Sequence, residues 1–155
     1  MIGVVRFLYL LGLGIWIGEI AFFSFVVAPE VFGVLGPERA GPVVGAIFPR
    51  YYALGGAAAT LALGCGLVLG RRATTPVWWS AATLSIAVGL AATLWAAIVV
   101  HPRAQHLRVT LQDAGQAPAA NPDFQRAHRT AVVLNATALL ARIAGLGFSA
   151  AGLRQ

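Results

Sequence analysis

The sequence predicts an all-α integral membrane protein, folded as a four-transmembrane-helix bundle. Of its 155 residues, 59% are hydrophobic and only 10% are charged, whereas a soluble domain carries about 25% charged residues. Long apolar runs recur along the chain, and a membrane-spanning helix needs about 20 apolar residues. This length leaves no room for a separate soluble domain, so residues 1–155 are expected to form one transmembrane domain.

The charged residues argue for lipid as the main partner. The formal net charge of +6 comes from Arg alone, since the chain contains no Lys. These Arg residues are scattered, whereas a nucleic-acid partner would require a clustered basic face. Cys65 is the only cysteine, which excludes an internal disulfide. We therefore expect a lipid bilayer, and no nucleic acid, around this chain.

The first helix is predicted over about residues 4–28, where Arg6 and Glu19 are the only interruptions. A secretory signal has a shorter apolar core than this, so we expect the helix to be retained. The next stretch, residues 29–49, is rich in Pro and Gly and is expected to connect two helices. The second helix is predicted over about residues 51–69.

The third helix is predicted over about residues 77–100, with an exit or a kink at His101-Pro102. From there to residue 123 the composition turns polar, so residues 103–123 are expected to be a polar loop that could begin as a short amphipathic helix. Asn121-Pro122-Asp123 is a helix start signal, with a proline and an acid in the opening turn. The fourth helix is accordingly predicted over about residues 124–150.

The expected localisation is a multi-pass position in the cell membrane, as in the bacterial inner membrane. Basic residues favour the cytoplasmic side. Arg6 lies beside the amino terminus at one end of the first helix, and Glu30 lies at its other end. We therefore expect both termini to be cytoplasmic.

Small residues recur every four positions in several helices, which lets helix backbones approach closely within a bilayer. This spacing predicts close packing within the bundle, and it also suits a homo-oligomer or a larger membrane complex. The residues concerned are Gly14 and Gly18; Ala81, Ser85, Gly89 and Thr93; and Thr137, Ala141, Gly145 and Ser149.

Several polar side chains are predicted to share one level in the membrane. A rise of 1.5 Å per residue places Glu19 about 22 Å along its helix, and Asn135 and Thr93 at similar heights. Tyr51 opens the second helix just above them, and Arg142 lies about 10 Å further in, where a long side chain can also reach the head groups. We therefore expect Asn135 to hydrogen-bond the first or third helix.

Glu19 is the residue that most needs an explanation, because an ionisable group inside a membrane is expensive and often marks a pathway or a ligand site. In a structural interpretation its carboxyl group is protonated, or hydrogen-bonded to Asn135 or Arg142, and locks the bundle. In a functional interpretation it contacts a proton, a cation or a substrate. Both interpretations require Glu19 to point toward other helices rather than toward lipid.

His101 and His128 end one predicted helix and begin the next, so they could meet at the mouth of the bundle. Imidazoles there could ligate a metal or haem, or relay protons near neutral pH. Two His without a nearby thiol, thioether or second carboxylate are a weak metal signal. The alternative is a structural or interfacial role.

The order of several motifs is distinctive. Trp16-Ile17-Gly18 is followed by Phe48-Pro49-Arg50-Tyr51-Tyr52, then by His101-Pro102-Arg103, and finally by His128 and Asn135. This order resembles the transmembrane-protein-205-like family, grouped in bacteria as uncharacterised family 4149. The resemblance covers about residues 7–147 and implies a four-helix membrane protein with little established chemistry.

Three functions remain open on the sequence alone. The first is transport or permeation of a small ligand or ion, with Glu19 and Asn135 inside the bundle and the His pair at its mouth. The second is a structural or accessory subunit of a larger membrane complex, and the third is a membrane protein that binds haem or a quinone. No arrangement of a nucleophile with a base is visible, so an enzyme is not favoured, and no cofactor is assigned.

Overall fold

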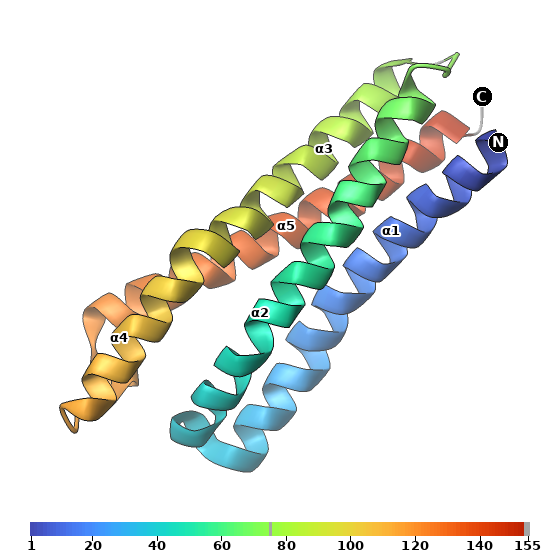
Figure 1. The fold of residues 1–155 in the computed structure, drawn as a ribbon. Helices are drawn as coiled ribbons and strands as arrows, with labels where there is room; N and C mark the ends of the chain where they lie inside the picture. Colours follow the sequence, from blue (N-terminus) through green and yellow to red (C-terminus); the bar gives the residue numbers. More distant parts are fainter. Residues whose placement is uncertain (75, 154–155) are drawn as a thin grey trace.

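The computed structural model describes residues 1–74 and 76–153, and these residues contain helices and no strands. The chain runs as long rods that lie along one another, with the start of α1 and the end of α5 at the same end (Figure 1). The elements are α1 (Ile2–Phe22), the π-helical turn η1 (Phe23–Val27), α2 (Ala28–Gly70), α3 (Pro76–Trp95), the π-helical turn η2 (Ala96–Val100), α4 (His101–Asp113), the 3-10 turn η3 (Pro118–Ala120) and α5 (Pro122–Leu153).

The predicted count of four helices needs a correction. Within the described residues, three helical segments are long and apolar enough to cross a membrane: Ile2–Gly70, Pro76–Asp113 and Pro122–Gly152. The sequence predicted two separate helices where the first of these segments stands. Residues 29–49, expected to be a connection, are helical instead.

Gly36 explains how one segment replaces two helices. Its backbone (φ 68°, ψ 165°) is the only non-helical point inside α2, and glycine tolerates such a positive φ without a steric penalty. The chain turns back there, so that the later part of α2 lies beside α1 (Figure 1). Pro37 follows at once, in the first turn of the returning helix, where a missing N–H costs nothing. A Pro/Gly-rich composition therefore produced a reversal of about one residue rather than a long loop.

Each π-helical turn comes just before a proline. Pro29 follows η1 and Pro102 follows η2. A proline ring inside a helix clashes with the carbonyl group four residues earlier and removes one hydrogen bond, and a π-helical turn relieves this locally. The chain therefore passes through His101-Pro102 without leaving the helix.

The polar stretch predicted over residues 103–123 divides into two parts. The first is the short helix that the sequence allowed, because α4 continues the line of α3 as far as Asp113, and the loop is limited to the residues between α4 and α5. Leu111 is buried on this helix, while Arg103 and His106 are exposed. This one-sided burial supports a helix of otherwise polar composition. The helix ends before Gly115, whose φ of 68° suits glycine.

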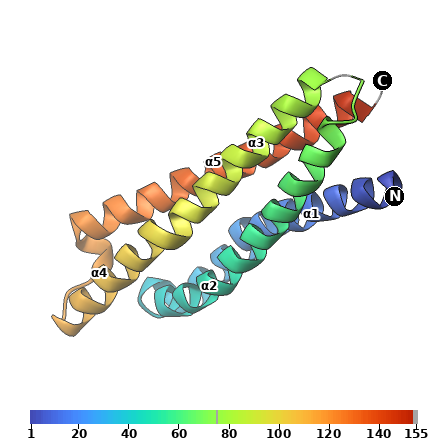
Figure 2. The same ribbon diagram turned by 45° about the horizontal axis from the view of Figure 1, so that its top comes forward.

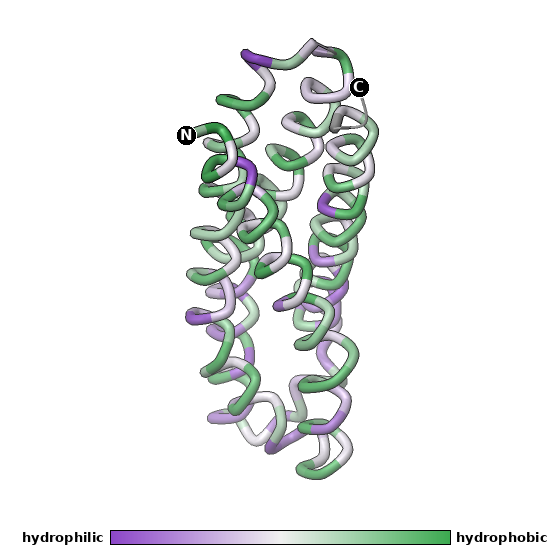
Figure 3. The backbone as a smooth tube through the Cα atoms, turned by 90° about the vertical axis from the view of Figure 1, so that its right-hand side faces the viewer, coloured by the Kyte–Doolittle hydropathy of each residue, from purple (hydrophilic) through white to green (hydrophobic). Residues whose placement is uncertain are grey.

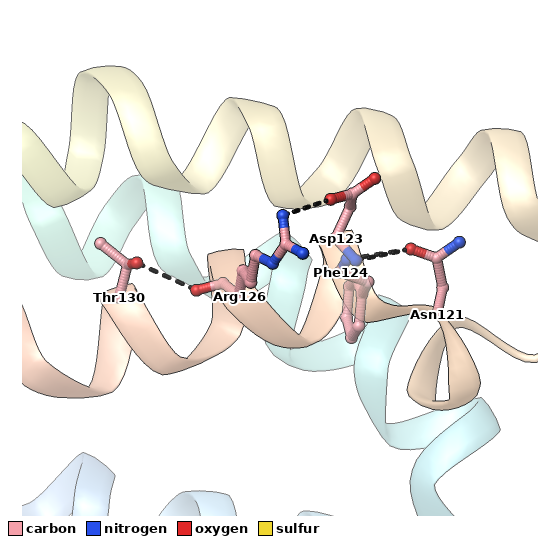
Figure 4. Close-up of polar contacts among 5 residues, drawn as sticks. All are labelled: Asn121, Asp123, Phe124, Arg126 and Thr130. Atoms are coloured by element: carbon pink, nitrogen blue, oxygen red, sulfur yellow. Dashed lines mark hydrogen bonds and ion pairs between the residues drawn. The ribbon is translucent and has the colours of Figure 1, made fainter.

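The start of α5 was predicted correctly. The Asn121 side-chain oxygen accepts hydrogen bonds from the backbone N–H groups of Asp123 (2.9 Å) and Phe124 (3.2 Å), as Figure 4 shows. This is an N-cap, followed by Pro122 at the first helical position. Further along the first turns, Arg126 pairs with Asp123 at 3.4 Å, and the Thr130 hydroxyl donates to the Arg126 carbonyl.

The helices pack as two groups. α1 contacts α2, and α3 contacts α5, with α2 and α3 joining the groups near the turn between them. In Figure 2 the groups diverge toward the end of the bundle that holds α4. On the outside, large apolar side chains such as Phe25 (71% exposed), Leu84 (67%) and Ile98 (70%) face outward, and hydrophobic residues dominate the helices along their length (Figure 3). Such a surface suits a bilayer rather than water.

The small-residue stripes pack as predicted between α3 and α5 but not in α1. A Cβ on Gly89 would lie 3.3 Å from Ala141 Cβ, and one on Gly145 would lie 3.2 Å from an Ile86 side-chain carbon. In α1, however, the space around Gly14 and Gly18 is open. Gly12 makes the close approach instead: a Cβ there would lie 2.9 Å from the Ala58 carbonyl oxygen.

Candidate functional site

Arg142 of α5 lies in the centre of the bundle, and only 1% of its surface is exposed. Its Nη1 donates to the Trp16 carbonyl oxygen at 2.9 Å, and its Nη2 donates to the Thr93 hydroxyl at 3.1 Å. The guanidinium carbon also lies 4.0 Å from the centroid of the Trp16 ring. Arg142 therefore connects α1, α3 and α5, and it does not extend to the head groups as its length would have allowed.

Asn135, two helical turns before Arg142, joins two other elements. Its side-chain oxygen accepts a hydrogen bond from the Tyr51 hydroxyl at 3.0 Å, and its amide nitrogen lies 3.2 Å from Ser24 Oγ. Ser24 belongs to η1 and Tyr51 to α2. Ser24 lies within the first predicted helix, residues 4–28, so Asn135 makes the expected hydrogen bond to that helix. Its second partner, Tyr51, lies in the second predicted helix and was not expected.

Glu19 faces the bundle, but it is not hydrogen-bonded to Asn135 or Arg142. Both carboxyl oxygens are buried and have no hydrogen-bond partner. One of them, Oε2, lies 2.8 Å from the position that a Cβ on Gly55 would occupy. Glycine at position 55 therefore makes room for the carboxyl group. Of the structural interpretation, the form in which Glu19 is hydrogen-bonded to Asn135 or Arg142 does not match this arrangement.

Together these residues form a polar layer inside an apolar bundle: Trp16, Glu19, Ser24, Tyr51, Thr93, Asn135 and Arg142. Trp16 lies between Arg142 and the Glu19 carboxyl group. Its ring contacts Arg142, and it also lies 3.4 Å from the Cβ position of Gly55, next to which the carboxyl group of Glu19 is placed. Besides the carboxyl oxygens of Glu19, the indole nitrogen of Trp16 and Nε of Arg142 are buried without a partner. Buried polar atoms are normally hydrogen-bonded, so this layer has unused capacity to bind polar groups.

A cleft of about 470 Å³ opens beside this layer, where the two groups of helices diverge. Pockets for small ligands are typically about 300–1,000 Å³ and mostly apolar. Asn135 and Ser24 line the cleft and also belong to the polar layer. The two features are therefore continuous at Asn135.

Six Phe and Tyr side chains line the cleft, and so do both predicted histidines. His101 packs against Phe48 (5.3 Å between ring centroids) and Tyr52 (5.9 Å), whereas His128 is exposed. Among the described residues, no group of three or more His, Cys, Asp or Glu side chains is arranged to hold a metal ion. The histidines thus share a cavity, in which one is packed and the other is accessible.

Ser24 of η1 lines the cleft without having been predicted from the sequence, and so do Gln105 and Arg108 on α4. The two side chains of α4 lie against glycines of α2: a Cβ on Gly41 would overlap the Arg108 guanidinium, and one on Gly45 would overlap the Gln105 amide. Arg108 also lies over the Phe124 ring, 5.1 Å from its centroid. Gly41 and Gly45 have the same four-residue spacing as the small-residue stripes of the other helices. This spacing was the sequence signal that could have indicated a close approach to α2 here.

Comparisons with known proteins give a family but no activity. A family model described as "Domain of unknown function (DUF4149)" matches residues 11–112, which include Glu19, Tyr51, Thr93 and Arg108. An uncharacterized protein of Aquifex aeolicus (strain VF5) is 44% identical over 63 residues, which is 41% of this chain and 40% of that protein. The matched part therefore spans less than half of that relative. No solved structure matches the chain.

Proposed function

The chain belongs to the family described as Domain of unknown function (DUF4149), and from the geometry of its site we propose that it transports or admits a small amphipathic ligand. In this proposal the ligand enters the cleft from the bilayer and reaches the polar layer at Asn135. The wider relationship to transmembrane-protein-205-like proteins, which the order of motifs suggested, is part of the same proposal.

We also propose that the chain crosses the cell membrane four times, with both termini in the cytoplasm. The helical arms on either side of Gly36 each hold more than 30 residues. At 1.5 Å per residue each arm is about 50 Å long, whereas the hydrocarbon core is about 30 Å thick. Each arm is therefore long enough to cross once, and an even number of crossings returns the termini to one side.

One observation carries the transport proposal: Asn135 lines the cleft and is hydrogen-bonded within the polar layer. A ligand in the cleft could exchange hydrogen bonds with Asn135 and Ser24 without crossing hydrocarbon. Beyond them lie Thr93, Arg142 and the partnerless carboxyl group of Glu19. Intramembrane polar groups arranged in this way are typical of substrate and proton pathways.

The experiment uses protein reconstituted in phosphatidylcholine vesicles that contain a fluorescent NBD-labelled single-chain lipid in both leaflets. Dithionite added outside destroys the fluorescence of the outer leaflet only. If the protein moves the probe across the membrane, the inner half of the signal also disappears, and it disappears more slowly with Asn135→Leu. Persistence of the inner half in vesicles shown to contain folded protein would contradict transport of this class of ligand.

A second candidate, a haem- or quinone-binding protein, has a specific observation in its favour, because His101 and His128 line the same cleft. Histidines can ligate haem or hydrogen-bond a quinone carbonyl. A visible spectrum of protein purified from its native membrane distinguishes this candidate from transport. A haem band, or a quinone extracted at one molecule per chain, would favour the second candidate. Loss of that molecule in the His101→Gln/His128→Gln double variant would assign its binding site to the cleft.

A further inference from the structure

We propose that the cleft binds an amphipathic molecule with one apolar chain and one anionic head group, which Arg108 holds. This inference rests on the proposed function and names its ligand class. The head group is a carboxylate or a phosphate, since both match the planar donor fork of a guanidinium.

The charge of the cleft favours an anionic ligand. Arg108 lines the cleft, and none of the acidic residues of the chain does. Within the described residues the one ion pair is Arg126 with Asp123, so Arg108 has no carboxylate partner in the protein. A half-buried charge in aromatic surroundings is costly without a counter-charge. An anionic ligand would supply that counter-charge.

Contacts with α2 and α5 restrict where the Arg108 guanidinium lies before a ligand binds. The lack of a side chain at Gly41 lets the guanidinium lie directly against the α2 backbone, and its central carbon lies 5.1 Å from the centroid of the Phe124 ring. Gln105, one turn before Arg108 on the same helix, packs against Gly45 and adds an amide group to the cleft. Donors whose positions are already restricted lose less conformational entropy on binding, which favours affinity. A flexible surface arginine would not have these constraints.

The shape of the cleft fits a chain rather than a compact ion. On α5 its wall runs from Phe124 to Leu139, which is about 22 Å at the helical rise. The end near Phe124 holds Arg108 and His128, whereas the other end is closed by Ile20 and Leu139. The one charged side chain of the lining therefore lies near one end of the cleft, and the wall beyond it is mostly apolar apart from Ser24 and Asn135. A single-chain amphiphile has its charge at one end in the same way.

The test measures binding without any transport. Electron spin resonance of protein in phosphatidylcholine bilayers counts the immobilised fraction of three spin-labelled probes: stearate, its uncharged methyl ester, and a lysophosphatidate. We expect about one stearate per chain to bind about tenfold more tightly than the ester, because a hydrogen bond to a charged group is worth roughly this factor. The lysophosphatidate arm separates a phosphate head group from a carboxylate.

Variants of α4 attribute the preference to one side chain. Arg108→Gln should abolish the preference for stearate over its ester, and Arg108→Lys should keep part of it. Arg103→Gln is the matched control, since Arg103 is exposed on the same helix and does not line the cleft. Equal binding of stearate and ester by the unaltered protein, or an unchanged preference in Arg108→Gln, would overturn the inference.

Two outcomes separate this inference from the transport proposal. If stearate binds through Arg108 but no NBD-labelled lipid crosses the vesicle membrane, the ligand class stands and transport fails. If lipid crosses but binding ignores head-group charge, transport stands and the ligand class fails. Immobilisation of many probe molecules per chain, equal in all variants, would show only boundary lipid and would also overturn the inference.

Discussion

The guanidinium of Arg142 stacks on the indole of Trp16, with its central carbon 4.0 Å from the ring centroid, and donates a hydrogen bond to the carbonyl of the same residue. A charge fully buried in an apolar helical bundle needs such contacts, because apolar side chains provide no hydrogen bonds. Arg142 also reaches Thr93. This one side chain therefore connects three helices at the level of the polar layer.

Replacing Arg142 by Ala should lower the free energy of unfolding by about 3 kcal/mol. A desolvated cation–π contact is worth about 2 kcal/mol, and hydrogen bonds to a charged group add about 1.5 kcal/mol or more. Unfolding in mixed micelles of increasing dodecyl sulfate content measures this change. Arg129→Ala, on the exposed side of the same helix, serves as the control and should change stability by less than about 0.5 kcal/mol. Equal effects of the two variants would contradict this role of Arg142.

Gly12 and Gly14 should respond in opposite directions to alanine. A Cβ on Gly12 would lie 2.9 Å from the Ala58 carbonyl oxygen, and backbone cannot move aside cheaply. Overpacking of this kind costs about 1–3 kcal/mol. The space at Gly14 is open, so Gly14→Ala should gain up to about 1 kcal/mol of helix propensity. Thermal unfolding of both variants in detergent measures the difference, and a shift of the same sign for both would refute the assigned contact.

Local signals were the most predictable part of the fold. Asn121 and Pro122 start α5 where the capping pattern indicated, because an N-cap acts within one turn. The resemblance to the bacterial family 4149 was confirmed over residues 11–112. The last two residues of the motif order, His128 and Asn135, lie outside that match. The same matches do not bear on the transmembrane-protein-205-like naming.

Features that depend on tertiary contacts were less predictable. Composition indicated a connection over residues 29–49, but a single glycine with a positive φ reverses the chain and the flanking residues stay helical. Spacing selected Gly14 and Gly18 for close packing, yet the face of α1 that meets α2 carries Gly12. A four-residue period identifies a stripe without identifying which helix covers it. For the same reason, no pattern in the sequence alone paired Arg108 with Gly41.

Asn135→Leu should leave the fold intact and slow the movement of the NBD-labelled lipid. It removes the hydrogen bonds to Tyr51 and Ser24, and polar pairs within membranes contribute only about 0.6 kcal/mol each on average. A stability loss of about 1 kcal/mol is therefore expected in the dodecyl sulfate titration. Thr137→Val, an exposed position on the same helix, is the control for both measurements. If Asn135→Leu transports as fast as Thr137→Val, Asn135 is not part of the pathway.

Gly41→Ala tests how Arg108 is held, and it changes no charge. The new methyl group would occupy the space of the guanidinium, which can swing away because it ends a flexible side chain. Unfolding stability should therefore change by less than about 0.5 kcal/mol, while immobilisation of spin-labelled stearate falls several-fold. Gly33→Ala, where a Cβ meets open space, is the matched control. Unchanged stearate binding in Gly41→Ala would mean that the contact with Gly41 of α2 does not position Arg108.

Glu19→Leu should separate stability from function, because both oxygens of this carboxyl group are buried and accept no hydrogen bond. A partnerless buried polar group costs about 1–3 kcal/mol, so an apolar side chain of similar volume should leave the unfolding free energy unchanged or raise it. If the carboxyl group contacts the ligand or a proton, transport is lost at the same time. Glu30→Leu, at an exposed position near the far end of the same helical arm, controls for loss of an acidic residue. Reduced stability of Glu19→Leu with unaltered transport would make Glu19 a structural residue after all.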